Sequence, residues 1–203
     1  MSTIPQFEVE LVPRCLVVDP PMSNVEFEAF CRANDNVQVE RTSEGVIWIN
    51  PPAGRDTTRA NMEISGQLYS WWCKHERGEV TDSSGGFYFA DGSMLSPDAA
   101  FVRPDTLKTI AEQRRVSFYP VHPDFVIELL SSTDSLTKTQ AKMESWIANG
   151  VQLGWLIDPF QKKVFLYQPG ASVKIFAGKT LKGDGPVEGF ILDLARVWRY
   201  YEG

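Results

Sequence analysis

The hydrophobic positions of the chain recur at helical spacing in three segments. In the longest, from about residue 56 to 75, apolar side chains return every three or four residues, which predicts one buried face; they are Ile64, Leu68, Trp71 and Trp72. A second segment begins at Asp134 or Ser135, both good N-cap residues, and ends before Gly150. A third begins with a capping box, Ser23 followed by Glu26.

Between the helical segments the pattern changes to short apolar or alternating runs, which predict strands. The strands are expected on both sides of the turn 43–45, at 79–82, 86–90 and 98–102, at 121–130, and in "LGWLIDP", "KKVFLYQPG" and "SVKIFAG". Asp91-Gly92 is expected to form the turn between the strands 86–90 and 98–102. Residues 106–115 and the C-terminal segment are expected to form short helices. This order predicts a mixed α/β or α+β fold with a central sheet between helices. Residues 1–21 are expected to be an extended lead-in and residues 22–203 a single domain.

Composition narrows the class of protein. The chain is 43% hydrophobic, and its formal charge is −6 from 20 basic and 26 acidic residues. The basic residues never occur in runs longer than two, so the sequence does not predict a basic nucleic-acid coat, although a local basic groove stays possible. Three cysteines and two histidines suggest no zinc site and fit a reduced, cytoplasmic setting. We expect neither a signal peptide nor a membrane span.

One charged residue interrupts an apolar run. Glu128 lies within Phe125–Leu130, and side chains alternate along a strand, so Glu128 shares a face with Val126 and Leu130. Burying an isolated carboxylate costs several kcal/mol unless it is compensated. The compensation could be a structural ion pair with an arginine, exposure at the sheet edge, or a bound cation.

Three further residues could act with Glu128. Asp98 follows Ser96-Pro97, Glu63 borders the apolar stripe of its helix, and Lys142 shares a helix face with Trp146. Each alone has an ordinary structural interpretation: a turn aspartate, a solvated glutamate and a lysine reaching water. Together they suggest phosphoryl chemistry, because two carboxylates on adjacent strands can hold Mg²⁺ and a lysine can orient the attacking water.

The segments "SPDAAFV" and "PDFVIELLSSTDSLTKTQAKMESWIANGVQLGWLIDP" carry a resemblance to a known family. They resemble the bacterial putative restriction endonuclease family, long described as a domain of unknown function, in the PD-(D/E)XK nuclease superfamily; the similarity extends over about residues 22–200. It implies a restriction-endonuclease-like fold, in which a mixed central sheet is flanked by helices. It also implies that Asp98 and Glu128 bind Mg²⁺, for which Mn²⁺ can substitute, and that Glu63 and Lys142 complete the catalytic set. The superfamily pattern places a lysine two residues after the acid, where this chain has Leu130.

Three functions follow as alternatives. The first is a Mg²⁺-dependent DNA endonuclease, expected to be a homodimer because cutting a duplex takes two active sites. The second is a catalytically weak or inactive protein of the same fold that acts as a DNA-binding or dimeric interaction module. The third is a structural or ligand-binding domain whose buried acids are merely paired, which predicts that Glu128 faces an arginine. Convergence of Glu63, Asp98, Glu128 and Lys142 on one point would separate the first from the others.

Overall fold

The computed structural model describes residues 15–35, 37–110 and 118–202. The main sheet has six strands, in the order β11 (Lys174–Phe176), β10 (Lys163–Tyr167), β9 (Leu153–Asp158), β8 (Phe125–Leu129), β7 (Ala99–Val102) and β4 (Glu79–Asp82). A second sheet has five strands, in the order β1 (Cys15–Leu16), β3 (Ile47–Asn50), β2 (Gln38–Arg41), β6 (Met94–Leu95) and β5 (Phe87–Tyr88). A two-stranded ribbon joins β12 (Thr180–Lys182) to β13 (Ile191–Asp193). The helices are α1 (Asn24–Ala33), α2 (Arg55–Trp72), α3 (Pro104–Lys108), α4 (Leu136–Ala148) and α5 (Leu194–Trp198), with a 3₁₀ turn at Gly185–Val187.

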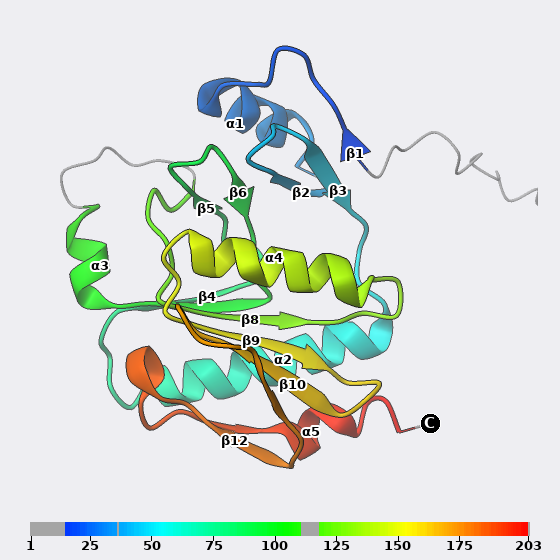
Figure 1. Cartoon of the computed structure of the whole chain (residues 1–203), viewed down its shortest axis with the longest axis vertical. Helices are drawn as coiled ribbons and strands as arrows, with labels where there is room; N and C mark the ends of the chain where they lie inside the picture. Colours follow the sequence, from blue (N-terminus) through cyan, green and yellow to red (C-terminus); the bar gives the residue numbers. More distant parts are fainter. Residues whose placement is uncertain (1–14, 36, 111–117, 203) are drawn as a thin grey trace, which may run out of the picture.

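The main sheet is mixed and is covered by α2 on one face and α4 on the other (Figure 1). Only β8 and β9 are parallel; the other neighbours in this sheet pair antiparallel. Parallel strands need a crossover connection, and α4 supplies it between β8 and β9. The fold is therefore the mixed α+β architecture that the sequence predicts, with a central sheet between helices.

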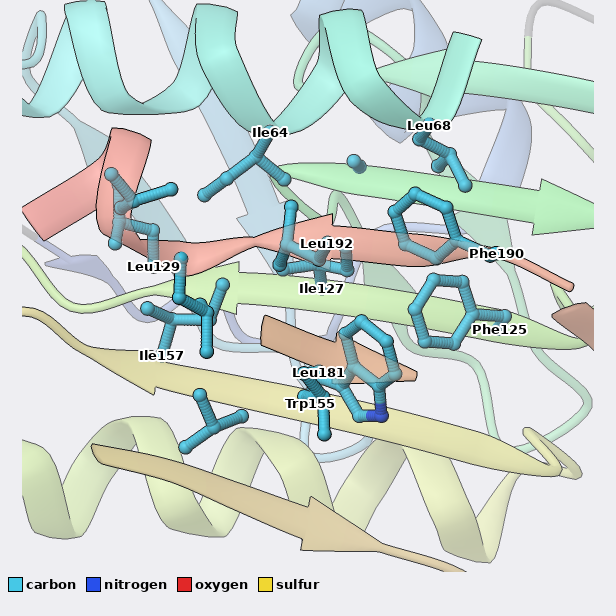
Figure 2. Close-up of a cluster of buried hydrophobic side chains, with 14 of the residues drawn as sticks. Ile64, Leu68, Phe125, Ile127, Leu129, Trp155, Ile157, Leu181, Phe190 and Leu192 are labelled. Carbon is cyan, nitrogen blue, oxygen red and sulfur yellow. The ribbon is translucent and has the colours of Figure 1, made fainter. Parts of the chain in front are cut away.

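Strand β8 is buried on both faces, and its side chains alternate as expected. Phe125, Ile127 and Leu129 face α2, where Figure 2 shows them beneath Ile64 and Leu68. The opposite face carries a separate cluster, to which β8 contributes Val126 and α4 contributes buried apolar side chains, Met143 and Trp146. A third, smaller core lies between α1 and the five-stranded sheet and includes Phe27, Val39, Ile47 and Met94.

Most of the predicted elements form, but four short strands, β1, β6, β12 and β13, were not predicted. The capping box Ser23–Glu26 begins α1, and Gly150 follows α4 with a positive φ of 105°. The turn at Asp91-Gly92 forms, yet it joins β5 to β6 in the five-stranded sheet rather than leading directly to the strand 98–102. Strands β6, β12 and β13 have two or three residues each, too few to show a period of two.

At the edges of the predicted elements the structure adds detail. Residues 15–16 of the expected lead-in form β1, which pairs with β3. Helix α3 ends at Lys108; residues 111–117 of the helix expected over 106–115 lie outside the described residues. Among the helices that the structure describes, none is long and apolar enough to cross a membrane.

Three elements meet on one side of the main sheet. Helices α2 and α4 begin on the right in Figure 1, and β8 ends there. The C-terminal end of the chain lies on the same side. The N-terminal turns of two helices thus flank the end of β8, a strand buried along its whole length, where Asp98 and Glu128 lie.

Candidate functional site

Glu128 and Lys142 form the centre of a buried polar cluster. Glu128 is 5% exposed and lies on the α4 face of β8. Its Oε1 is 2.8 Å from Nζ of Lys142 and accepts a hydrogen bond of 2.8 Å from Nε1 of Trp146. Residues four apart on a helix are neighbours on its surface, so Lys142 and Trp146 reach the same carboxylate oxygen. Lys142 therefore reaches Glu128 from the helix.

Asp98 lies beside Glu128 on the neighbouring strand. Its backbone N–H donates to the carbonyl of Ile127 at 3.0 Å, and the register pairs Ala99 with Ile127, so Asp98 stands opposite Glu128 one position further along. Its Oδ2 accepts a hydrogen bond from the backbone N–H of Leu129 at 2.7 Å, and its Oδ1 accepts one from Nδ2 of Asn61 at 2.7 Å. Sheet and helix thus fix both carboxylate oxygens.

The second sheet contributes a third carboxylate, Glu40 of β2. Its Oε1 is 2.9 Å from Nζ of Lys142 and accepts the backbone N–H of Ser96 at 2.7 Å, while its Oε2 accepts Nδ2 of Asn50 at 3.1 Å. Sequence reasoning missed Glu40, because this glutamate lies 58 positions before Asp98, in a separate hairpin, and has no local signature. The only signal is the charged pair Glu40-Arg41 inside a predicted strand.

All three donors of the Lys142 ammonium are engaged. Besides Glu40 and Glu128, its Nζ donates to the carbonyl oxygen of Ser96 at 2.8 Å. A lysine ammonium has three N–H bonds and no acceptor. The ammonium must therefore give up one of these acceptors before it can donate to a water or a phosphate.

The cluster holds more negative than positive charge. Burial raises the pKa of Glu128 to about 8; Lys142 opposes that rise, whereas Asp98 and Glu40 add to it. Burial also raises the pKa of Asp98, against the hydrogen bond from Leu129 and the charge of Lys142. Burial by itself would lower the pKa of Lys142, but the carboxylates of Glu128 and Glu40 outweigh it and raise that pKa. Three carboxylates thus share one ammonium in a buried place, which favours a further cation.

The donor set fits Mg²⁺ bound through two carboxylates. Asn61 adds an oxygen beside Asp98: its Oδ1 is buried and has no hydrogen-bond partner among the described residues. In the part of the chain that the structure describes, no group of three or more His, Cys, Asp or Glu side chains is arranged to enclose a metal. Mg²⁺ typically takes one or two carboxylates and completes its octahedron with water and substrate phosphate. Asp98 and Glu128, with Asn61 nearby, match that mode rather than an all-protein cage.

Glu63 lies apart from this cluster. It is on the flank of α2 that faces α5, where its Oε1 is 2.6 Å from Nε of Arg196 and its Oε2 is 3.2 Å from Nη2 of Arg199. Its side chain is 10% exposed, and none of its contacts within the described ranges involves Asp98, Glu128 or Lys142. Of the four predicted site residues the structure therefore brings three together, and Asn61, two positions before Glu63, is the α2 residue that touches Asp98.

Two further expectations concern the same end of the sheet. Leu130, at the position where the superfamily pattern has lysine, is buried, and its backbone N–H donates to the carbonyl of Ile157. The cation that Glu128 meets is Lys142, and no arginine contacts Glu128 among the residues described, contrary to what the third alternative predicts.

Comparisons with known proteins agree with the fold and identify a family. The sequence pattern of the Uma2 family, described as "Putative restriction endonuclease", matches residues 25–195. A crystal structure of a putative nuclease belonging to DUF820, from Anabaena variabilis ATCC 29413, is similar with a TM-score of 0.68 at 21% sequence identity, covering 80% of this chain and 90% of that one. No curated protein sequence matches. Because the family pattern spans most of the chain, including Asp98, Glu128 and Lys142, the chain belongs to the Uma2 putative restriction endonuclease family.

Proposed function

We propose that this chain is a metal-dependent DNA endonuclease that hydrolyses phosphodiester bonds, with its catalytic centre at Asp98, Glu128 and Lys142. The observation that carries the proposal is the convergence of two carboxylates and one ammonium at one end of the sheet; they come from the residue before β7, from β8 and from α4. Family membership supports a nuclease-like activity. DNA as substrate, Mg²⁺ as cofactor, a homodimer and a cytoplasmic location are the finer parts of this proposal.

The chain's own residues would orient the reacting groups. Asp98 and Glu128 would hold Mg²⁺ or Mn²⁺, and such an ion polarises the phosphoryl oxygen and lowers the pKa of a bound water. Asp98 is held for this role by the N–H of Leu129 and the amide of Asn61, so its oxygens do not rotate freely. Lys142 supplies the positive charge that stabilises the charge developing on the phosphate.

Glu40 would act as a positioning residue. It ties Lys142 to the backbone of Ser96, two residues before Asp98, and so connects the second sheet to the site. Glu63 is then assigned a structural role between α2 and α5, because both of its oxygens are committed to Arg196 and Arg199.

A second candidate function is favoured by one specific observation. Every N–H bond of the Lys142 ammonium already has an acceptor within the protein. If the cation remains locked in this arrangement, the fold binds DNA or a second copy of the chain without cutting. This is the non-catalytic module that the replacement of the motif lysine by Leu130 also suggests.

The deciding experiment is cleavage of plasmid and oligonucleotide DNA with Mg²⁺ or Mn²⁺. We expect Asp98→Asn and Lys142→Met to reduce the metal-dependent rate by about 10²–10³-fold, the usual cost of removing one group that stabilises the transition state. Glu144→Gln is a matched control, because Glu144 lies on α4 near Lys142 but is exposed. If the wild type and all three variants cleave DNA at the same rate, the activity comes from a contaminating nuclease.

A binding measurement separates an inactive site from an absent one. Mg²⁺ at about 100 times its Kd should stabilise the wild type by about 2.7 kcal/mol and leave Asp98→Asn unaffected. Stabilisation by metal without cleavage of any DNA would favour the non-catalytic module. If Mg²⁺ neither stabilises the protein nor supports cleavage, the proposed metal site is wrong.

A further inference from the structure

Two exposed cations near the site have no acidic partner in the part of the chain that the structure describes. The guanidinium carbon of Arg59 lies 4.4 Å from the ring centroid of Tyr200, and Nζ of Lys138 lies 4.9 Å from that of Trp48. Neither side chain forms an ion pair with a described residue. The charge of each is therefore uncompensated, while contact with an aromatic face restricts where it can lie.

Lys138 and Trp48 border the cluster on the α4 side. Lys138 is one helical turn before Lys142, so the two lysines are neighbours on the helix surface. Trp48 is paired with Glu40 in the register of β2 and β3, and Glu40 contacts Lys142. The Lys138–Trp48 pair is thus connected to the catalytic lysine both along the helix and across the second sheet.

Arg59 and Tyr200 border the site on the α2 side. Arg59 is on the same helical turn as Asn61, but on the flank that faces the C-terminal segment. The next residue, Tyr201, hydrogen-bonds through its hydroxyl to Oγ1 of Thr57 at 3.4 Å. Burial raises the pKa of Tyr201, and the carboxylates of Asp56 and Asp98 add to the rise. The C-terminal tyrosines therefore lie at the Asp98 end of α2, on the side where α2 and α4 begin in Figure 1.

We propose that Arg59 and Lys138, each held against its aromatic ring, bind backbone phosphates of one nucleic-acid strand on the two sides of the bond to be cut. This inference rests on the proposed nuclease function and names the track by which the substrate enters that site. Phosphates are the ligand that uncompensated, exposed Arg and Lys side chains fit, and such contacts fix register without reading sequence.

The neighbouring cations do not serve the same purpose. Arg196 and Arg199 share the carboxylate of Glu63, and Lys142 is engaged inside the cluster. Acidic side chains, Asp56 and Asp134, also lie near this end of the sheet. The field there is therefore not uniformly positive, and binding depends on the two local contacts. Because α2 and α4 cover opposite faces of the sheet, a strand that contacts both Arg59 and Lys138 crosses the end of the sheet and spans several nucleotides.

The test is the salt dependence of DNA binding, measured by fluorescence anisotropy in EDTA so that no cleavage occurs. A labelled single strand and its duplex are titrated with wild type, Arg59→Gln, Lys138→Gln and the double variant. Each single substitution should reduce the slope of log affinity against log salt by about 0.7 on the single strand and about 0.9 on the duplex. The double variant should lose both contributions, and Arg59→Lys and Lys138→Arg should retain the slope because they retain the charge.

The matched control is Lys174→Gln, which removes one exposed positive charge from the edge strand β11. An unchanged slope in Arg59→Gln and Lys138→Gln, or an equal reduction in Lys174→Gln, would overturn the phosphate track. Binding with the expected slopes by a wild type that cuts no DNA would instead remove the nuclease proposal and leave the track in place. If the wild type cleaves DNA but the variants show the same salt-dependence slope as the wild type, the nuclease proposal stands and the phosphate track is wrong.

Discussion

A carboxylate is buried at each end of strand β8, and the two carboxylates differ in how far their charge is balanced by neighbouring groups. At the beginning, Asp124 is fully buried. Its Oδ1 is 2.6 Å from Nε of Arg103, and its Oδ2 accepts the backbone N–H of Arg103 and the hydroxyl of Thr106, both at 2.8 Å. One acid meets one cation and two further donors, so its charge is balanced within the protein.

At the other end, Glu128 meets one cation among the described residues, Lys142, and shares it. Lys142 also forms an ion pair with Glu40, and the carboxylate of Asp98 lies beside Glu128. A buried oxygen of Asn61 has no partner among the described residues. This end has too little positive charge for its carboxylates, whereas the carboxylate of Asp124 has a full set of partners.

A buried acid by itself does not mark a functional site. Asp124 is more deeply buried than Glu128 and fastens α3 to the sheet. What distinguishes the Glu128 end is the imbalance of charge and the unfilled hydrogen-bonding capacity, because both are costly in a low-dielectric interior unless a ligand supplies what is missing.

The largest effect on stability should come from removing the carboxylate of Asp124, whose hydrogen bonds and ion pair are complete. Asp124→Ala removes three hydrogen bonds to a buried carboxylate, and we expect it to lower the free energy of unfolding by about 3 kcal/mol, or the melting temperature by about 6–12 °C. Glu128→Gln keeps an acceptor for Trp146 and should cost less, because it also relieves repulsion among the carboxylates. Urea unfolding of both variants in EDTA measures the difference. A larger loss for Glu128→Gln would reverse the comparison.

The charge imbalance should also appear in the pH dependence of stability. The pKa of Glu128 is raised to about 8 in the folded protein. Between the ordinary carboxyl range and about pH 8, the folded state therefore holds a proton that the unfolded state has released, so stability falls as pH rises. This single group contributes at most about 1.4 kcal/mol per pH unit, and Glu128→Gln should remove that contribution.

The measurement is chemical unfolding of wild type and Glu128→Gln across this range in EDTA. The stability of the variant relative to wild type should increase with pH. A constant difference would mean that Glu128 is ionised throughout and that Lys142 balances it. Repeating the titration with Mg²⁺ should flatten the wild-type curve, because a cation bound by Glu128 favours its charged form.

The smallest effect is expected for the predicted acid that lies outside the cluster. Glu63→Gln weakens ion pairs with Arg196 and Arg199, which are about half exposed, so we expect a loss of about 1 kcal/mol in stability. The rate of metal-dependent cleavage per folded molecule should stay within about threefold of wild type. Glu63 shares no contact with Asp98, Glu128 or Lys142 among the described residues, and substitutions at sites without shared partners act independently. A rate loss as large as that of Asp98→Asn would return Glu63 to the catalytic set.

Long periodic segments explain why much of the fold could be predicted. The stripe Ile64–Leu68 in α2 and the alternation in β8 follow directly from the sequence. The convergence of Asp98, Glu128 and Lys142 was also predictable, through the resemblance to a family. The short strands β6, β12 and β13 were not, because two or three residues carry no period and form only against partners already in place.

The sequence by itself determined the central strand, its buried acid and the helix that carries Lys142, because these depend on local periodicity and on adjacent segments. Only the tertiary structure decided which side chains complete the site. Glu40 comes from a separate sheet, and Asn61 rather than Glu63 contacts Asp98, because the two lie on different flanks of α2. Such contacts join residues far apart in the chain, and no pattern within one segment specifies which distant carboxylate a buried lysine will meet.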